Sequence, residues 1–101
     1  MTNLVYVGLM TASFFCHCKL CCGKASEPTA SGRWPVAGIT IAAPRSIPLG
    51  TWLYLDGIGW RRVDDRAARR HDGRIDVFVG GPGQHQTARR NGLRRVAVFR
   101  R

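Results

Sequence analysis

The residues best suited to chemistry form one cluster near the start of the chain, in the order Cys16, His17, Cys18, Cys21 and Cys22. In an oxidising compartment an even number of cysteines indicates disulfides, whereas in a reducing compartment the same cluster can hold a metal. The spacing of Cys18 and Cys21 is that of a zinc knuckle, which normally draws its other ligands from a distant segment, here His71 or His85. Three interpretations therefore stay open: a zinc site, one or two local disulfides, or thiols that form neither. No other cofactor is expected.

A second chemical feature is the large excess of arginine. The 101 residues contain 16 Lys plus Arg against 6 Asp plus Glu, which gives a formal net charge of +10. Most of this charge lies between Trp60 and Arg101, a stretch with 12 arginines and 4 aspartates. Such a charge predicts a polyanionic partner, either nucleic acid, an anionic cell-wall polymer or membrane headgroups. The alternative is a basic surface that only faces solvent.

The elements that must position these residues are short. With 101 residues, 45% of them hydrophobic, the chain predicts one globular domain. Turn-forming residues divide it into segments with the alternation of strands. One helix is expected over 85–91, ended by the Asn91-Gly92 cap. Six strands and one helix predict a closed or nearly closed barrel; the strands are expected at 4–15, 39–43, 51–55, 60–65, 74–79 and 96–99.

The first of these segments also bears on location. Leu4, Val5, Tyr6 and Val7 supply apolar side chains to both faces, as a buried barrel strand requires. The segment is too short to span a bilayer, and it has neither a basic start nor a small-residue cleavage site. We therefore expect no signal peptide and no transmembrane segment. The chain would be made in the cytoplasm and would act at the cell wall if exported or released by a phage.

Several short motifs follow one another in a fixed order along the chain. They are Thr29-Ala30-Ser31-Gly32, Gly38-Ile39-Thr40-Ile41-Ala42-Ala43-Pro44, Ile47-Pro48-Leu49-Gly50-Thr51, Val63-Asp64-Asp65-Arg66 and Arg74-Ile75-Asp76-Val77-Phe78, followed by His85, Ala88 and Gly92. This ordered set resembles the three-aspartate (3D) domain family, especially its small cysteine-containing phage and bacterial members. It is also similar to the catalytic barrel of membrane-bound lytic transglycosylase A.

The resemblance implies a fold and an activity. The fold would be all-β, a six-stranded double-psi β-barrel with one short helix, formed by residues 1–101 as a single domain. The activity would be the cleavage of peptidoglycan glycan strands. Family members carry two aspartates eleven positions apart, as Asp65 and Asp76 are here. By this resemblance Asp76 is the catalytic acid and Asp65 supports the site.

One carboxyl group is enough for this reaction, because the 6-hydroxyl of muramic acid is the nucleophile. Asp76 would protonate the glycosidic oxygen and then accept the hydroxyl proton as the anhydro ring closes. Ile75, Val77 and Phe78 could provide apolar surroundings that keep Asp76 protonated. The alternative is an outward-facing aspartate paired with Arg74 or Arg66. For Asp65 the alternative is a structural carboxylate that accepts backbone N–H groups of the following loop.

The expected substrate-binding residues are Thr51, Trp52, Arg66, Arg74 and His85. Trp52, like Trp34 and Trp60, could stack on a sugar ring. It also alternates with Leu53 and so fits the core equally well. His85 matches a family position at the start of the helix, where it either contacts substrate beside Asp76 or bonds only locally.

The chain departs from the family pattern at two places. Ala43 stands where the first of the three aspartates is expected, and Ala67-Ala68 replaces a glycine pair after Asp65. Alanine tolerates left-handed backbone poorly, so the loop is expected to differ. Asp72 is close enough in sequence to replace a missing carboxylate.

These departures leave open a second function, a noncatalytic basic barrel. Such a barrel would bind nucleic acid or an anionic wall polymer, by combining cationic and stacking side chains. In either case a monomer is expected.

Overall fold

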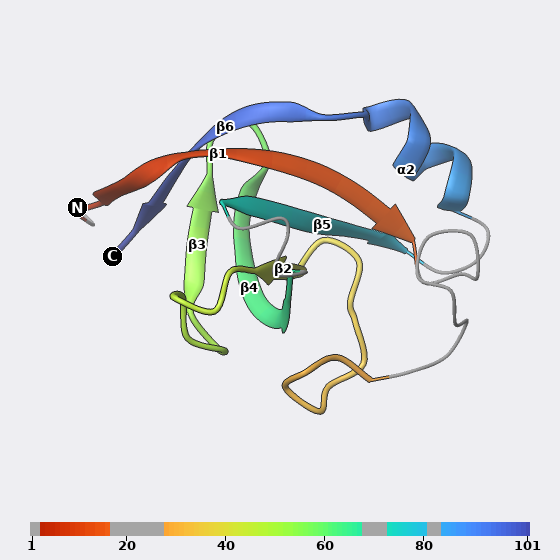
Figure 1. Ribbon diagram of the computed structural model, residues 1–101, viewed down its shortest axis with the longest axis horizontal. Helices are drawn as coiled ribbons and strands as arrows, with labels where there is room; N and C mark the ends of the chain where they lie inside the picture. Colours follow the sequence, from red (N-terminus) through yellow and green to blue (C-terminus); the bar gives the residue numbers. More distant parts are fainter. Residues whose placement is uncertain (1–2, 17–27, 68–72, 81–83) are drawn as a thin grey trace.

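The computed structural model describes residues 3–16, 28–67, 73–80 and 84–101 (Figure 1). Within these ranges the strands form a closed barrel in the order β1-β5-β2-β4-β3-β6. This confirms the predicted six-stranded barrel with a short helix, whereas its double-psi topology stays a prediction. The elements are β1 (Val5–Cys16), β2 (Thr40–Ala43), β3 (Trp52–Leu55), β4 (Gly59–Arg66), β5 (Arg74–Gly80), α2 (His85–Asn91) and β6 (Arg94–Arg100).

The barrel mixes both kinds of strand pairing. β1 pairs with β5, and β2 with β4, in parallel. The other neighbours are antiparallel: β1 with β6, β2 with β5, β3 with β4, and β3 with β6. Parallel neighbours need long connections, whereas antiparallel ones can be joined by a tight turn. Strands far apart in the sequence therefore lie side by side, and β2 separates β4 from β5.

Local sequence explains the tight connections. β3 and β4 form the predicted hairpin through a turn at 56–58, where Gly57 has φ 81°. α2 spans the predicted residues and ends at Gly92, whose φ of 62° is readily adopted only by glycine. The Gly92 N–H donates a hydrogen bond to the Arg89 carbonyl at 3.2 Å. No helix in the described ranges is long and apolar enough to cross a membrane.

The core fills the inside of the barrel and receives side chains from all six strands. Inward residues alternate with outward ones along each strand, as the strand period requires. Trp52 is 45% exposed, so it lies outside the core and its neighbour Leu53 lies inside. The core residues are Ala12, Ile41, Ala43, Leu53, Leu55, Val63, Ile75, Val77, Val96 and Val98.

The first half of β1 differs from the prediction of a buried strand. Val5, Tyr6 and Leu9 are 44%, 58% and 52% exposed. The reason is that β5 pairs with β1 only from Thr11 onward. Before that residue β1 has β6 as its described pairing partner, and its outer face is open to solvent.

Replacement of Ile41 by alanine is expected to lower the free energy of unfolding by about 3 kcal/mol, because the side chain is fully buried and a cavity would remain. Urea unfolding followed by circular dichroism measures the loss. Leu93→Ala, at a residue 67% exposed, is the matched control and should leave the midpoint nearly unchanged. Equal midpoints for the two variants would contradict the assigned core.

Candidate functional site

Four residues on four neighbouring strands form one row across the outside of the barrel. Ser13 on β1 pairs with Asp76 on β5, Asp76 pairs with Ala42 on β2, and Ala42 pairs with Asp65 on β4. Paired residues of adjacent strands project from the same face of a sheet. We call this set the aspartate row. It places the two predicted aspartates on one face with only the small Ala42 between them.

The spacing within the aspartate row separates the two carboxylates. β5 and β4 each lie one strand spacing from β2, so their backbones are about 10 Å apart. Asp65 and Asp76 also bond to different neighbours. They are therefore two independent carboxylates rather than a pair that shares a proton.

Asp76 is held through one of its two oxygens. Its Oδ1 accepts a hydrogen bond from the Ser13 hydroxyl and a second from Arg74 Nε at 3.2 Å. Arg74 Nε also lies 3.1 Å from Ser13 Oγ, which completes a small network. The side chain of Asp76 is 24% exposed, and Oδ2 has no hydrogen-bond partner within the described residues. One oxygen is thus fixed by two side chains.

The predicted apolar surroundings of Asp76 are wrong in part. Ile75 and Val77 belong to the barrel core, so their side chains point away from the aspartate row. Phe78 is buried against Phe15, with ring centroids 5.3 Å apart. Alternation along β5 leaves Phe78 on the same face as Asp76, and the residues that bond to the carboxylate are polar, Ser13 and Arg74. The ion pair with Arg74, the alternative interpretation, is present.

Asp65 holds the backbone around it. Its Oδ1 accepts the N–H of Ala30 at 3.0 Å and the N–H of Arg66 at 2.9 Å. The first bond ties the segment before β2 to the end of β4. This is the structural role considered for Asp65, with Ala30 as a partner that sequence order did not indicate.

Arg66 likewise bonds to backbone. Its guanidinium donates to the carbonyls of Pro44 and Ile47. Arg66 therefore stabilises the turn after β2. Among the described residues, these two carbonyls are the partners of its guanidinium group. Of the predicted substrate-binding residues in the described ranges, Arg74 contacts Asp76 through its side chain, and Arg66 contacts Asp65 through its backbone N–H.

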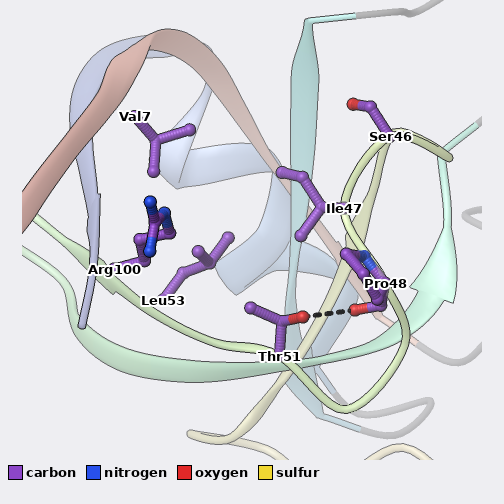
Figure 2. Close-up of a pocket in the computed structure, with 7 residues that line it drawn as sticks. All are labelled: Val7, Ser46, Ile47, Pro48, Thr51, Leu53 and Arg100. Carbon is purple, nitrogen blue, oxygen red and sulfur yellow. Dashed lines mark hydrogen bonds between the residues drawn. The ribbon is translucent and has the colours of Figure 1, made fainter.

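Thr51 and Trp52 lie at two other places. Thr51 lines a pocket of about 310 Å³ between the barrel end and the turn after β2, and its hydroxyl donates to the Pro48 carbonyl at 2.7 Å (Figure 2). Trp52 lines a second pocket, of about 290 Å³, with Trp60 and Arg101. Neither pocket is lined by an aspartate. The sequence motifs therefore do not gather all the predicted residues into one site.

Asp64 is a structural carboxylate that the sequence motifs did not single out. It is fully buried and accepts hydrogen bonds from Arg62 Nε at 2.7 Å and from the Thr40 hydroxyl at 2.8 Å. The bond to Asp64 raises the pKa of Arg62, because it stabilises the charged guanidinium. Asp64 thereby joins β4 to the start of β2. The only signal in the sequence was the Arg62-x-Asp64 spacing, which places both side chains on one strand face.

The alanines that depart from the family pattern, Ala43 and Ala67, fit their surroundings in the described part of the chain. Ala43 is fully buried in the core, so an aspartate at this position would point a carboxylate among apolar side chains. Ala67 is buried, and among the described residues only glycines have positive φ. Ala67 therefore carries no left-handed strain. Ala68 and Asp72 lie outside the described residues.

The cysteine cluster is described only at its first member. Cys16 is buried at the end of β1. Outside the described residues lie His17, Cys18, Cys21, Cys22 and His71, together with the side chain of His85 at the start of α2. Across the described part of the chain no group of three or more His, Cys, Asp and Glu could hold a metal. The zinc site therefore stays a prediction.

Comparisons with known proteins do not identify the chain. No protein-family model matches it, and no curated protein matches it. The relation to the three-aspartate domain family thus depends on the ordered motifs alone.

Replacement of Asp64 by asparagine is expected to lower the free energy of unfolding by about 3 kcal/mol, because it leaves the Arg62 guanidinium without its buried counter-charge. Thermal and urea unfolding measure the effect. Asp56→Asn, at an exposed position in the β3–β4 turn, is the control. Equal stability of the two variants would contradict the structural role of Asp64.

Proposed function

We propose that the chain is a lytic transglycosylase-like enzyme that cleaves glycosidic bonds of peptidoglycan through the single carboxyl group of Asp76. A double-psi barrel of the three-aspartate type is part of this proposal. The observation that supports it most is the asymmetric setting of Asp76: Oδ1 is fixed by Ser13 and Arg74, and Oδ2 is left to a substrate. A fixed carboxyl with one working oxygen is what proton transfer to a glycosidic oxygen needs.

The reaction requires one proton that leaves Asp76 and returns to it. The Oδ2 proton passes to the glycosidic oxygen, and the bond between this oxygen and the anomeric carbon breaks with its electron pair on the oxygen. The 6-hydroxyl of the muramic acid then attacks the anomeric carbon. Its proton passes to Oδ2, so the carboxyl is restored and no water is consumed. The products are a free hydroxyl end and a 1,6-anhydro ring.

Before substrate binds, Asp76 forms an ion pair with Arg74. Peptidoglycan brings its own lactyl and peptide carboxylates. In the proposed mechanism one of these substrate carboxylates replaces Asp76 as the partner of Arg74, because a guanidinium group binds a carboxylate through two parallel hydrogen bonds. Asp76 is then released from Arg74, stays bonded to Ser13 and presents Oδ2 to the glycosidic oxygen. Arg74 would thus bind Asp76 in the free protein and the substrate in the complex.

Asp65 has a supporting role in this proposal. Through Ala30 it fixes the segment before β2 beside the aspartate row. Thr51 and Trp52 line pockets elsewhere and would contact only distant parts of a long glycan. His85, at the start of α2, would be a further substrate contact.

Purified protein incubated with murein sacculi is expected to release 1,6-anhydromuropeptides, detectable by mass spectrometry. Asp76→Asn should lower this release by about a hundredfold or more, because the amide cannot donate the proton. Asp56→Asn removes a carboxylate outside the aspartate row and should retain the activity.

Equal release by wild type and Asp76→Asn would contradict the proposed role of Asp76. Binding of the wild type to sacculi without any anhydro product would instead indicate a noncatalytic wall-binding module.

Ser13→Ala is expected to lower kcat about tenfold and to leave KM unchanged. Ser13 is only 7% exposed, so it acts by orienting Asp76 and does not bind the glycan. Ser46→Ala, at an exposed serine outside the row, is the matched control. A rise in KM with constant kcat would show that Ser13 contacts the substrate and that Asp76 needs no positioning.

A further inference from the structure

Aromatic side chains form a second row, on the part of the barrel that the aspartate row leaves free. Trp60 on β4 pairs with Tyr54 on β3, Tyr54 pairs with Phe99 on β6, and Phe99 pairs with Tyr6 on β1. Successive ring centroids are 5.5, 6.4 and 5.5 Å apart. We call this set the aromatic row. It is continuous across four strands.

The aromatic row lies on the outside of the barrel. Its members alternate with core residues such as Leu53, Leu55 and Val98, which point inward. Tyr6 is 58% exposed. Trp52, two residues before Tyr54 and on the same face, is 45% exposed and lines a pocket of about 290 Å³ with Trp60 and Arg101. Large aromatic surfaces are thus open to solvent, which normally marks a binding surface.

The charge beside the aromatic row is positive. The guanidinium of Arg101 lies 4.9 Å from the centroid of the Trp60 ring. Arg62 lies 5.7 Å from the Trp52 ring, but Asp64 balances its charge. Arg100 alternates with Phe99, donates to the Arg101 main-chain oxygen at 2.9 Å and lines the other pocket with Val7 and Leu53. Arg101 has no Asp or Glu partner within the described residues, so it is the arginine that the row offers to an anion. None of the four members of the aromatic row is acidic.

The two rows occupy different parts of the barrel. Along β4, Trp60 and Asp65 are five residues apart, about 16 Å; along β1, Tyr6 and Ser13 are seven apart, about 23 Å. The remaining members lie on β3 and β6 in one row and on β5 and β2 in the other. The start of β1 and the end of β6, beside the aromatic row, lie at the end of the barrel opposite α2 (Figure 1). A ligand of the aromatic row therefore need not approach Asp76.

We propose that the aromatic row, with Trp52 and Arg101, binds single-stranded nucleic acid. Bases would stack on the exposed rings, and a phosphate would contact Arg101 beside Trp60. Barrels that bind single strands use this combination of cationic and stacking side chains. Sugar rings also stack on aromatic side chains, but the guanidinium of Arg101 beside Trp60 favours a chain of phosphates over an uncharged sugar face. Because every base offers a π-face, little sequence preference is expected.

Fluorescence anisotropy with a labelled oligo-dT strand of about 20 nucleotides tests the proposal, since a strand of this length exceeds the site of one small barrel. Trp52→Ala is expected to weaken binding about tenfold, as the loss of one stacked base predicts. Trp34→Ala, which removes an exposed tryptophan outside the row, is the matched control and should bind like wild type. An abasic strand of equal length and charge should lose more affinity than the Trp52→Ala variant does, about a hundredfold or more, because every stacked base is removed.

The contribution of charge is measured by salt titration. Arg101→Ala should reduce the slope of log affinity against log salt by about 0.7, as expected for one lost phosphate contact with a single strand. Arg89→Ala, at an exposed arginine of α2, is the matched control and should keep the wild-type slope.

Three results would overturn this inference. They are wild-type affinity in folded Trp52→Ala, equal affinity for oligo-dT and the abasic strand, and absence of binding at low salt. If binding is absent and the protein forms a dimer that Tyr6→Ala dissociates, the row is a contact between two copies. Asp76→Asn should bind oligo-dT like wild type, so failure here is distinguishable from failure of the proposed glycan cleavage.

Discussion

The insertion of β2 between β4 and β5 is the constraint on which the rest of the structure depends. β2 has four residues, all of them buried, and it pairs with β4 in parallel and with β5 in antiparallel orientation. Without it the barrel would open between the two strands that carry Asp65 and Asp76. Ile41 and Ala43 fill the core, Ala42 separates the aspartates, and the Thr40 hydroxyl reaches Asp64. A short apolar strand thus both closes the barrel and sets the spacing of the candidate site.

Closure of the barrel also explains why one small domain has two different outer faces. The aspartate row runs over β1, β5, β2 and β4, and the aromatic row runs over β4, β3, β6 and β1. Register places the aromatic residues side by side in one row, and Ser13, Asp76 and Asp65 with the small Ala42 in the other. The arginines that give the net charge of +10 are not equivalent, because some are paired with aspartates and others are not. Arg62 and Arg74 are paired with aspartates, whereas Arg100 and Arg101 have no such partner within the described residues.

Much of the fold could be predicted because its signals are local. Alternation and turn residues gave the strands within a residue or two, and Asn91-Gly92 gave the end of α2. The burial of β1 was predicted wrongly because exposure depends on which strand pairs with each half, and this is not local. The motifs identified Asp65 and Asp76, but not the bond from Ala30 to Asp65 or the buried Asp64, which need β2 and β4 side by side. Thr51 and Trp52 were grouped with Asp76 by motif order, although they line pockets elsewhere.

The placement of both aspartates beside Ala42 is the central claim, and nuclear Overhauser contacts from the Ala42 methyl group test it most directly. In protein with labelled alanine methyls, this group should show cross-peaks to the β-protons of both Asp65 and Asp76, because paired residues on adjacent strands have Cβ atoms about 5 Å apart. Cross-peaks to only one of the aspartates, or to neither, would contradict the account. The carboxylates would then not share a face, and the candidate site would not exist as described.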